Sequence, residues 1–299
     1  MNPIEIHQLT KTFRGRRGRQ VEALRNLTLR VGEAEVVGFL GPNGAGKSTT
    51  IKTLMGQIRP TSGTALLFGE LTGAAHARLQ VGYLPENPAF YSFLTAREYL
   101  DLVGRTFVMG RAAILRESQR VLELLDLTEA ANRPIRGYSK GMVQRLGLAQ
   151  ALLHDPALYI LDEPMSGLDP VGRALVKDLM LDLKRQGKTV FFSTHVIADV
   201  EAVCDRVAIV AKGELRAEST VNEIMTAGID GYVVRLAQAP PLELREYLSS
   251  YATAAETDLY VPCHQLDLFL RQLDRTNCSI QMIEPRRRSL EDFFLKIIA

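Results

Sequence analysis

The fold of this 299-residue chain is indicated by one stretch, VVGFLGPNGAGKS at residues 36–48. Its first five residues are apolar and predict a buried strand, and the residues after Ser48 predict the start of a helix. Residues 41–48 between them match the phosphate-loop pattern G-x-x-x-x-G-K-[ST] at every fixed position. Backbone N–H groups and the positive end of the helix dipole converge at such a turn. The stretch therefore predicts a site for a nucleoside triphosphate.

We expect the loop to surround the phosphates. Lys47 should reach the β- and γ-phosphates as a point charge, and Ser48 should place its hydroxyl on Mg²⁺. A glycine-rich turn that matches by chance is the alternative, and the flanking strand and helix argue against it. The predicted nucleotide-binding residues of this segment are Gly41, Pro42, Asn43, Gly44, Ala45, Gly46, Lys47, Ser48 and Thr49.

Composition limits the classes of partner. The 36 basic and 34 acidic residues leave a net charge of +2, which gives no field that would gather nucleic acid or a membrane surface. The longest stretch without a charged residue is residues 36–46, shorter than the roughly 20 apolar residues of a membrane helix. Residues 1–5 do not resemble a secretion signal. Three widely spaced cysteines predict reduced thiols in a cytosolic protein, and the five histidines show no metal-ligand spacing with them.

The periodicity predicts an α/β fold, a P-loop NTPase with a mostly parallel sheet. Alternating runs at Ile4–Ile6 and Leu27–Val31 predict an N-terminal antiparallel β subdomain. Between them, the basic residues 14–19 fit a solvated hairpin tip better than a site for an anionic partner. Residues 88–155 have helical periodicity, including a capping box at residues 95–98, and predict a helical subdomain inserted between strands. Further strands are expected at residues 157–161, 189–193 and 207–210, and Asp169-Pro170 predicts a helix start.

The composition changes near residue 228, so we expect domains at residues 1–228 and 229–299. The order of elements in the second region is βαββαβ, which suggests a small ferredoxin-like α+β domain. A final helix is expected at residues 290–298. The strands are expected at residues 232–236, 253–256, 259–262 and 279–283, and the helices at residues 242–249 and 266–273.

Two carboxylates, Asp162 and Glu163, end the apolar strand that begins at residue 157. Ligands bind at the carboxyl ends of parallel strands. Asp162 suits the hold on Mg²⁺, and Glu163 suits the base that polarises the attacking water. Exposed acidic strand ends are common, so the Asp162-Glu163 pair indicates a catalytic site only in combination with the phosphate loop.

Residues 138–145, YSKGMVQR, carry a family resemblance. The segment is similar to the signature L-S-G-G-Q of the ATP-binding subunits of ABC transporters, and its variant form resembles the subunits of bacterial ABC-2 type exporters. Ser139 and Gly141 match the signature, whereas Tyr138, Lys140 and Met142 do not. A serine at a helix N-terminus can hold a phosphate. The resemblance implies that this phosphate belongs to ATP on the opposite subunit; an ordinary N-cap serine is the alternative.

The same resemblance extends to three more segments. Residues 166–169, ending in Asp169, follow Asp162-Glu163 as the family's D-loop does. His195 matches the switch histidine, which in the family contacts the γ-phosphate. Phe13 lies where the family stacks an aromatic ring on adenine, although a core or hairpin aromatic fits nearly as well.

Glu86 departs from the usual family pattern. It occupies the Q-loop region, where the family usually has Gln, and resembles exporter subunits in this respect. A carboxylate accepts hydrogen bonds from Mg²⁺-bound water but cannot donate as an amide does. We keep Glu86 as a predicted site residue for nucleotide and metal.

The resemblance implies an ATPase that energises a transporter, with ATP and Mg²⁺ as its cofactors. The expected partners are a second ATP-binding subunit, identical or paralogous, and a multispanning permease that holds the chain at the cytoplasmic face of the cell membrane. One alternative is a soluble ABC-type ATPase of translation or DNA repair, but this chain has one phosphate loop and no sustained heptads. A nucleotide switch that signals without transport is another.

Overall fold

The computed structural model describes residues 2–14, 20–226, 229–247, 258–276, 278–287 and 290–298. It divides the chain into two compact units, Met1–Ser219 and Thr220–Ile297. The sequence placed the change of domain at residue 228, and the limits of the functional domains stay a prediction. Among the described helices, none has the length and apolar character needed to span a bilayer.

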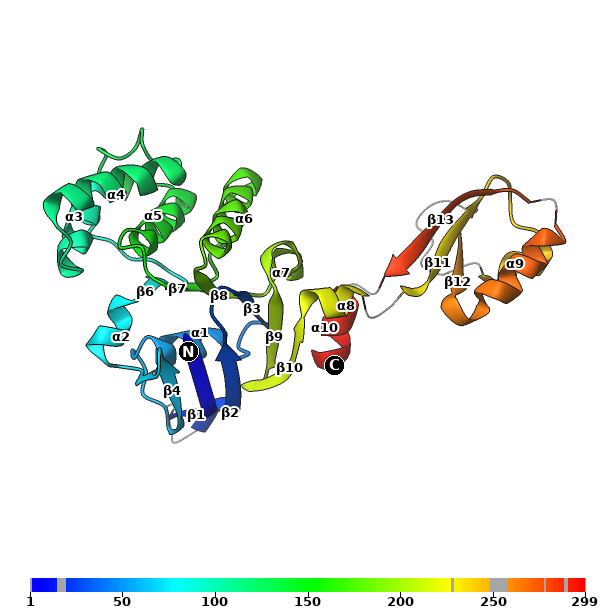
Figure 1. Cartoon of the computed structure of the whole chain (residues 1–299), viewed down its shortest axis with the longest axis horizontal. Helices are drawn as coiled ribbons and strands as arrows, with labels where there is room; N and C mark the ends of the chain where they lie inside the picture. Colours follow the sequence, from blue (N-terminus) through cyan, green and yellow to red (C-terminus); the bar gives the residue numbers. More distant parts are fainter. Residues whose placement is uncertain are drawn as a thin grey trace. The chain divides into compact units, whose positions relative to one another are not determined.

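A six-stranded sheet forms the centre of the first unit, with the strand order β10-β9-β3-β8-β7-β6 (Figure 1). The pairs β3–β8, β3–β9, β7–β8 and β6–β7 are parallel, as the alternation of strands and helices predicted. The carboxyl ends of β3, β7 and β8 therefore lie at one edge. The strands are β3 (Val36–Leu40), β6 (Val81–Leu84), β7 (Leu158–Asp162), β8 (Thr189–Thr194), β9 (Arg206–Ala211) and β10 (Glu214–Thr220).

The strands β3, β7 and β8 of this sheet are buried on both faces, which explains their nearly continuous apolar sequences. Along β7, Leu158 and Ile160 pack into one core cluster, and Tyr159 and Leu161 pack into the other. Alternate side chains of a strand point to opposite faces, so β7 supplies both cores. The cluster with Ile160 also contains Ile51 of helix α1 (Lys47–Leu54), which follows the phosphate loop. Packing in the two cores thus fixes the position of the phosphate loop relative to the strand ends.

The predicted N-terminal antiparallel subdomain is present. Strands β1 (Ile4–Arg14) and β2 (Gln20–Val31) are antiparallel, and they belong to a sheet of order β2-β1-β4-β5. The strands β4 (Ser62–Leu67) and β5 (Glu70–Leu71) of this sheet were not predicted. Helix α2 (Ala75–Leu79) follows them. The basic hairpin tip lies, apart from Arg14, outside the described residues.

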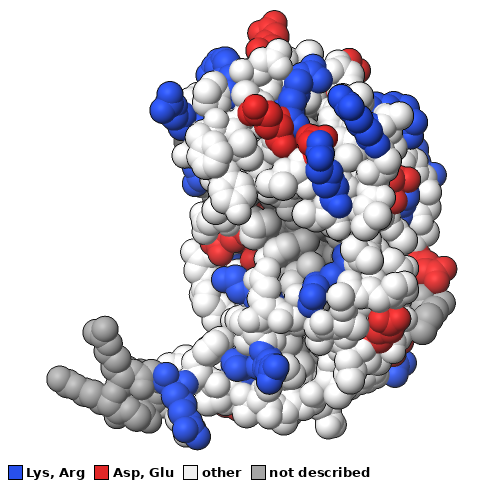
Figure 2. All heavy atoms as spheres, turned by 90° about the vertical axis from the view of Figure 1, so that its left-hand side faces the viewer, with Lys and Arg blue, Asp and Glu red and all other residues white. Residues whose placement is uncertain are grey.

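The predicted helical lobe consists of α3 (Ala96–Thr106), α4 (Arg111–Leu124), a short 3₁₀ turn η2 (Ile135–Gly137) and α5 (Lys140–Leu152). The capping box is formed: Glu98 N–H donates to Thr95 Oγ1, and Thr95 N–H donates to the Glu98 carboxylate at 2.8 Å. Figure 2 shows that acidic and basic side chains are mixed over the upper, helical part of this face.

Two helices follow the strands that end at the site. Helix α6 (Pro170–Arg185) begins at its predicted N-cap, since Gly172 N–H donates to Asp169 Oδ1 at 2.8 Å. Helix α7 (Ile197–Val203) begins just after His195. The sequence predicted α6 but not α7, which is only seven residues long.

The second unit has its own core around Val234, Leu259 and Phe269. Its described strands form an antiparallel sheet of order β12-β11-β13, with α9 packed on it. The helix expected at residues 242–249 is a 3₁₀ helix as far as it is described, and the strand expected at residues 253–256 lies outside the described residues. The elements are α8 (Val221–Thr226), β11 (Ile229–Leu236), η3 (Leu242–Tyr247), β12 (Asp258–Pro262), η4 (Cys263–Gln265), α9 (Leu266–Asp274), β13 (Ile280–Arg287) and α10 (Leu290–Ile298).

Candidate functional site

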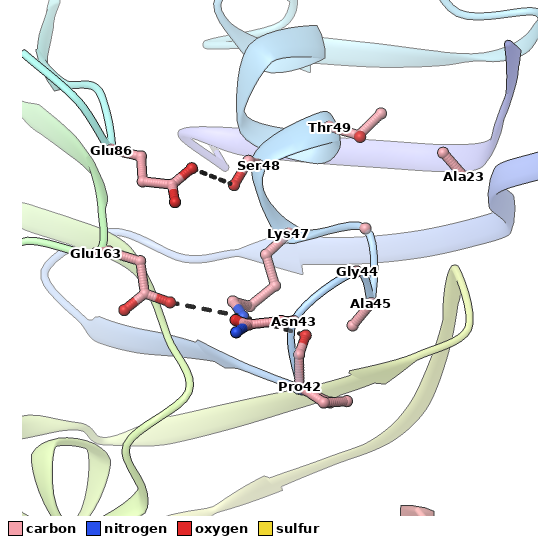
Figure 3. A pocket seen from close by; sticks show the side chains of 11 residues that line it. Ala23, Pro42, Asn43, Gly44, Ala45, Lys47, Ser48, Thr49, Glu86 and Glu163 are labelled. Atoms are coloured by element: carbon pink, nitrogen blue, oxygen red, sulfur yellow. Dashed lines mark hydrogen bonds and ion pairs between the residues drawn. The ribbon is translucent and has the colours of Figure 1, made fainter. Parts of the chain in front are cut away.

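The phosphate loop depends on glycines at two positive backbone angles. Gly44 has φ of 79° and Gly46 has φ of 110°, a region that other residues rarely occupy. A Cβ atom on Gly46 would lie 2.7 Å from Leu24 Cδ2 and 2.8 Å from Ala23 O. The loop lines a pocket that Figure 3 shows from close by, bordered by Ala23, Pro42, Asn43, Gly44, Ala45, Gly46, Lys47, Ser48, Thr49, Glu86 and Glu163.

The Lys47 ammonium is the cation of this pocket. Its Nζ donates to Gly41 O at 2.6 Å and lies 3.6 Å from Glu163 Oε1. The Lys47 side chain is only 6% exposed, so its charge acts where water screens it little. This geometry places a positive charge at the mouth of a helix N-terminus, where phosphate oxygens bind.

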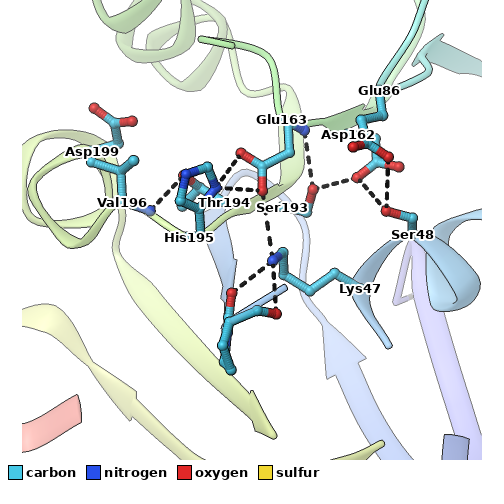
Figure 4. Close-up of polar contacts among 12 residues, drawn as sticks. Lys47, Ser48, Glu86, Asp162, Glu163, Ser193, Thr194, His195, Val196 and Asp199 are labelled. Carbon is cyan, nitrogen blue, oxygen red and sulfur yellow. Dashed lines mark hydrogen bonds and ion pairs between the residues drawn. The ribbon is translucent and has the colours of Figure 1, made fainter. Parts of the chain in front are cut away.

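Three oxygen-bearing side chains meet beside the loop (Figure 4). Ser48 Oγ lies 3.4 Å from both Asp162 Oδ1 and Glu86 Oε2. Asp162 is fully buried, and its Oδ2 finds no hydrogen-bond donor among the described residues. Hard oxygen donors of this kind are the ligands that Mg²⁺ prefers. The donor set and the buried unpaired oxygen therefore fit a divalent cation.

Burial raises the pKa of the Asp162 carboxyl, and the nearby Glu86 and Glu163 carboxylates raise it further. Hydrogen bonds from Ser193 and Ser48 act in the opposite direction. Ser193 Oγ donates to Asp162 Oδ1 at 2.5 Å. A cation bound at Asp162 would offset the burial of its charge.

Glu163 lies between Lys47 and His195 in Figure 4. His195 Nδ1 is 3.0 Å from Glu163 Oε1 and 3.1 Å from Oε2. The Glu163 side chain is 13% exposed, and its backbone φ is 50°. The carboxylate thus faces both the phosphate loop and the loop after β8, as a base beside the γ-phosphate must.

The signature residues lie elsewhere. Ser139 is the N-cap of α5, with its Oγ accepting from Met142 N–H at 3.2 Å. A Cβ atom on Gly141 would lie 3.5 Å from Gly167 O, so the signature helix begins beside the segment that follows Glu163. Neither Ser139 nor Gly141 is among the described residues that line the pocket of Lys47.

The remaining predicted residues are placed as follows. Asp169 caps α6 and does not line the pocket as described. Phe13 is 39% exposed on β1, and Lys11 Nζ lies 5.0 Å from the centre of its ring. It is likewise absent from the described lining. Neither arrangement tests the role in nucleotide binding that the sequence suggested.

Sequence reasoning missed Ser193, Gln144 and Asp199. Ser193 Oγ accepts from Glu163 N–H at 3.0 Å and so joins both carboxylate residues. Gln144 Nε2 donates to the carbonyls of Glu163 and Pro164. Asp199, 2% exposed, pairs with Arg173 and Lys177 of α6. Only Gln144 carried a signal, since it stands within the quoted signature segment.

Comparison with known proteins gives a family match. The model of the ABC transporter family matches residues 24–166. An uncharacterised ABC transporter ATP-binding protein of Synechocystis sp. is 41% identical over 301 residues, which cover 99% of this chain and 84% of that protein. The Nod factor export ATP-binding protein I of Burkholderia lata is 36% identical over 256 residues, covering 85% and 83% of the two chains.

A solved structure shares the architecture. It is the dimeric post-hydrolysis state of an ATP-binding cassette bound to ADP and phosphate. The TM-score is 0.68 at 25% identity, and the match covers 73% of this chain and 98% of that one.

Proposed function

We propose roles for the individual site residues of this chain, which belongs to the family of ABC transporter ATP-binding proteins. It is an ATPase subunit that energises a transporter, and it is not a factor of translation or DNA repair. The direction of transport is our inference: the relative from Burkholderia lata is named for export, and the variant signature at residues 138–145 resembles exporter subunits. We therefore assign the chain to an exporter.

The observation that carries the proposal is the position of the Glu163 carboxylate, which lies 3.6 Å from Lys47 Nζ and 3.0 Å from His195 Nδ1. Lys47 holds the β- and γ-phosphates of ATP, and His195 contacts the γ-phosphate. Glu163 accepts a hydrogen bond from the attacking water and polarises it. Catalysis here is mainly positioning and electrostatic stabilisation, because phosphoryl transfer asks for little covalent chemistry from the protein.

Mg²⁺ fits the same site. Ser48, Asp162 and Glu86 would hold it, directly or through water, and the unpaired Asp162 Oδ2 supports this assignment. When bound, the cation supplies neutralisation of phosphate charge. The protein contributes the side-chain oxygens of these three residues, and Ser193 orients the Asp162 carboxylate by donating a hydrogen bond to it.

The site needs a second subunit. Ser139 and Gly141 carry the family signature but are not among the described residues lining this chain's own pocket. They would complete the site of a partner, either a second copy or a paralogue. The dimeric cassette among the solved structures supports this arrangement. ATP would then close the pair through contacts to its γ-phosphate, and hydrolysis would release it.

A permease is the second partner, and it would hold the chain at the cytoplasmic face of the membrane. Two exposed aromatic side chains are candidates for its contact. Tyr91 is 58% and Phe93 is 72% exposed, with ring centres 6.0 Å apart, in the segment between Glu86 and the N-cap of α3. Exposed aromatics are enriched at protein interfaces. On the face that Figure 2 shows, the acidic and basic side chains of the described residues are mixed.

Copurification tests the function. Detergent extracts of cells with the tagged chain should yield a multispanning membrane protein, and Phe93→Asp should reduce that yield. Leu115→Asp is the matched control, since Leu115 is 63% exposed on α4 of the same lobe. Recovery only with ribosomes or DNA, and never with a membrane protein, would contradict the assignment.

A further inference from the structure

Gln144 is a buried polar residue next to the catalytic loop. It is 3% exposed and lies on α5, five residues after the N-cap Ser139. Its Nε2 donates to Glu163 O at 3.1 Å and to Pro164 O at 3.2 Å. The Gln144 amide thus donates to the backbone carbonyls of Glu163, the predicted base, and of the next residue, Pro164.

The backbone of Glu163 has a reason to need such support. Its φ of 50° lies in the left-handed region, which is unfavourable for a residue with a Cβ atom. Glu163 N–H donates to Ser193 O at 3.2 Å and to Ser193 Oγ at 3.0 Å, so β8 fixes one side of the residue. Gln144 fixes the other side from α5. Ser166 N–H also donates to Glu163 O at 3.0 Å, so the loss of Gln144 would leave this carbonyl one of its two donors and would weaken the restraint on the Glu163 backbone.

A turn of this backbone would move the carboxylate. Glu163 Oε1 lies 3.6 Å from Lys47 Nζ and 3.0 Å from His195 Nδ1, so a small rotation of the backbone would change both contacts of the carboxylate. Misplacement of a catalytic group by about 1 Å costs on the order of a hundredfold in rate. The two hydrogen bonds of Gln144 go to Glu163 and Pro164, neither of which belongs to the segment expected to bind the phosphates, and Gln144 is not among the described residues lining that pocket.

We propose that Gln144 is a positioning residue for ATP hydrolysis, holding Glu163 in its left-handed conformation through two buried hydrogen bonds. The inference rests on the role proposed above for Glu163. Arg145, the residue after Gln144, anchors the same turn of α5 by donating to Leu125 O at 3.1 Å and to Asp126 Oδ2 at 2.8 Å. The first turns of α5 therefore connect the helical lobe to the catalytic loop.

The test is the ATPase kinetics of the purified full chain with Gln144→Met, which keeps the side-chain length and removes the donor. The kcat should fall at least tenfold, while the Kd for ATP, measured by equilibrium binding, should stay within twofold. Gln150→Met is the matched control: Gln150 lies on the same helix and its Oε1 accepts from Tyr99 OH at 2.5 Å. An equal loss of kcat in the control, or an unchanged kcat in Gln144→Met, would overturn the inference.

A second variant separates positioning from folding. Gln144→Glu loses the donor when ionised and regains one O–H donor when protonated, and burial raises the pKa of a carboxyl. Its kcat relative to the unmodified chain should therefore recover as the pH falls from 8 to 6. A ratio that does not change with pH would count against the proposal.

The proposed role of Glu163 has its own control. If Glu163→Gln hydrolyses ATP at the normal rate, Glu163 is not the base and the proposed function of that residue fails. If Glu163→Gln loses the rate while Gln144→Met keeps it, only the positioning role of Gln144 is refuted.

Discussion

Asp162→Asn should stabilise the nucleotide-free chain while it impairs hydrolysis. The Asp162 carboxylate is fully buried, its Oδ2 has no donor among the described residues, and Glu163 and Glu86 lie nearby. An unsatisfied buried polar group costs about 1–3 kcal/mol, and more when it is charged. An amide removes the charge but leaves an unpaired N–H₂, so we expect a net gain of about 1–2 kcal/mol.

The gain should depend on pH in one direction. The pKa of Asp162 is raised in the folded chain, so the folded state binds this proton more tightly than the unfolded state does. The stability that this proton supplies is present in acid and is lost as the pH rises through the raised pKa. The advantage of Asp162→Asn should therefore be absent in acid and fully developed at pH 8.

The assay is thermal unfolding between pH 5 and 8, in buffer without nucleotide. A gain of about 1–2 kcal/mol corresponds to a rise in Tm of roughly 2–3 °C for a chain of 299 residues. Mg²⁺ with ATP should stabilise the unmodified chain more than the variant, since ligands shift unfolding by mass action. A lower Tm for Asp162→Asn at pH 8, or a difference that does not change with pH, would refute the reasoning.

Asp199→Asn is the matched control, because Asp199 is equally inaccessible but has cationic partners. Arg173 donates to both of its carboxylate oxygens at 2.9 and 2.8 Å, and Lys177 lies 3.2 Å away. Asp199→Asn removes the charge that Arg173 and Lys177 pair with, and a hydrogen bond to a charged group contributes about 1.5–3 kcal/mol. The same chemical change should therefore lower the Tm here. If both variants shifted the Tm in the same direction, the presence or absence of cationic partners would not decide the sign, and the reasoning would fail.

Three further outcomes are expected. Lys47→Ala should weaken ATP binding at least tenfold, or about 1.4 kcal/mol, in a titration with labelled nucleotide, and undiminished binding would contradict the loop assignment. Glu163→Gln should keep ATP affinity, lose about a hundredfold or more in kcat and elute as an ATP-dependent dimer in size-exclusion chromatography; a monomer under saturating ATP would argue against the shared site. Gly46→Ala should reduce ATP binding because its Cβ meets Leu24 and Ala23 at a φ of 110°, whereas Gly110→Ala, with open space around it, should bind normally.

Local signals predicted much of the fold. The capping box at Thr95 and the Asp169-Pro170 helix start depend on residues within one helical turn, and both formed as expected. The strands at residues 157–161 and 189–193 carry apolar runs long enough to identify buried strands. Strand β4 was missed, because its residues Ser62–Leu67 alternate weakly and obtain their place by pairing with β1.

Some residues of the site could likewise be predicted from local signals, and others could not. The phosphate loop and the Asp162-Glu163 pair are contiguous motifs whose chemistry the sequence displays. Ser193 completes the pair from 31 residues away in sequence, through its bond to Asp162. A serine at the end of an apolar strand carries no periodic or motif signal, so only the parallel pairing of β7 with β8 reveals that Asp162 faces Ser193.

The backbone of Glu163 shows why a motif cannot supply the whole site. A glutamate in the left-handed region is unfavourable by itself, so its sequence alone predicts an ordinary strand end. Its conformation persists because β8 holds the N–H, while Gln144 of α5 and the Ser166 N–H hold the C=O; β8 and α5 are distant in sequence from each other. Such strain concentrates at functional sites when the surroundings over-determine it. The direction of the Glu163 carboxylate, which we propose as the base, is therefore a property of the packed fold, and the residues that fix it are those that a motif leaves unassigned.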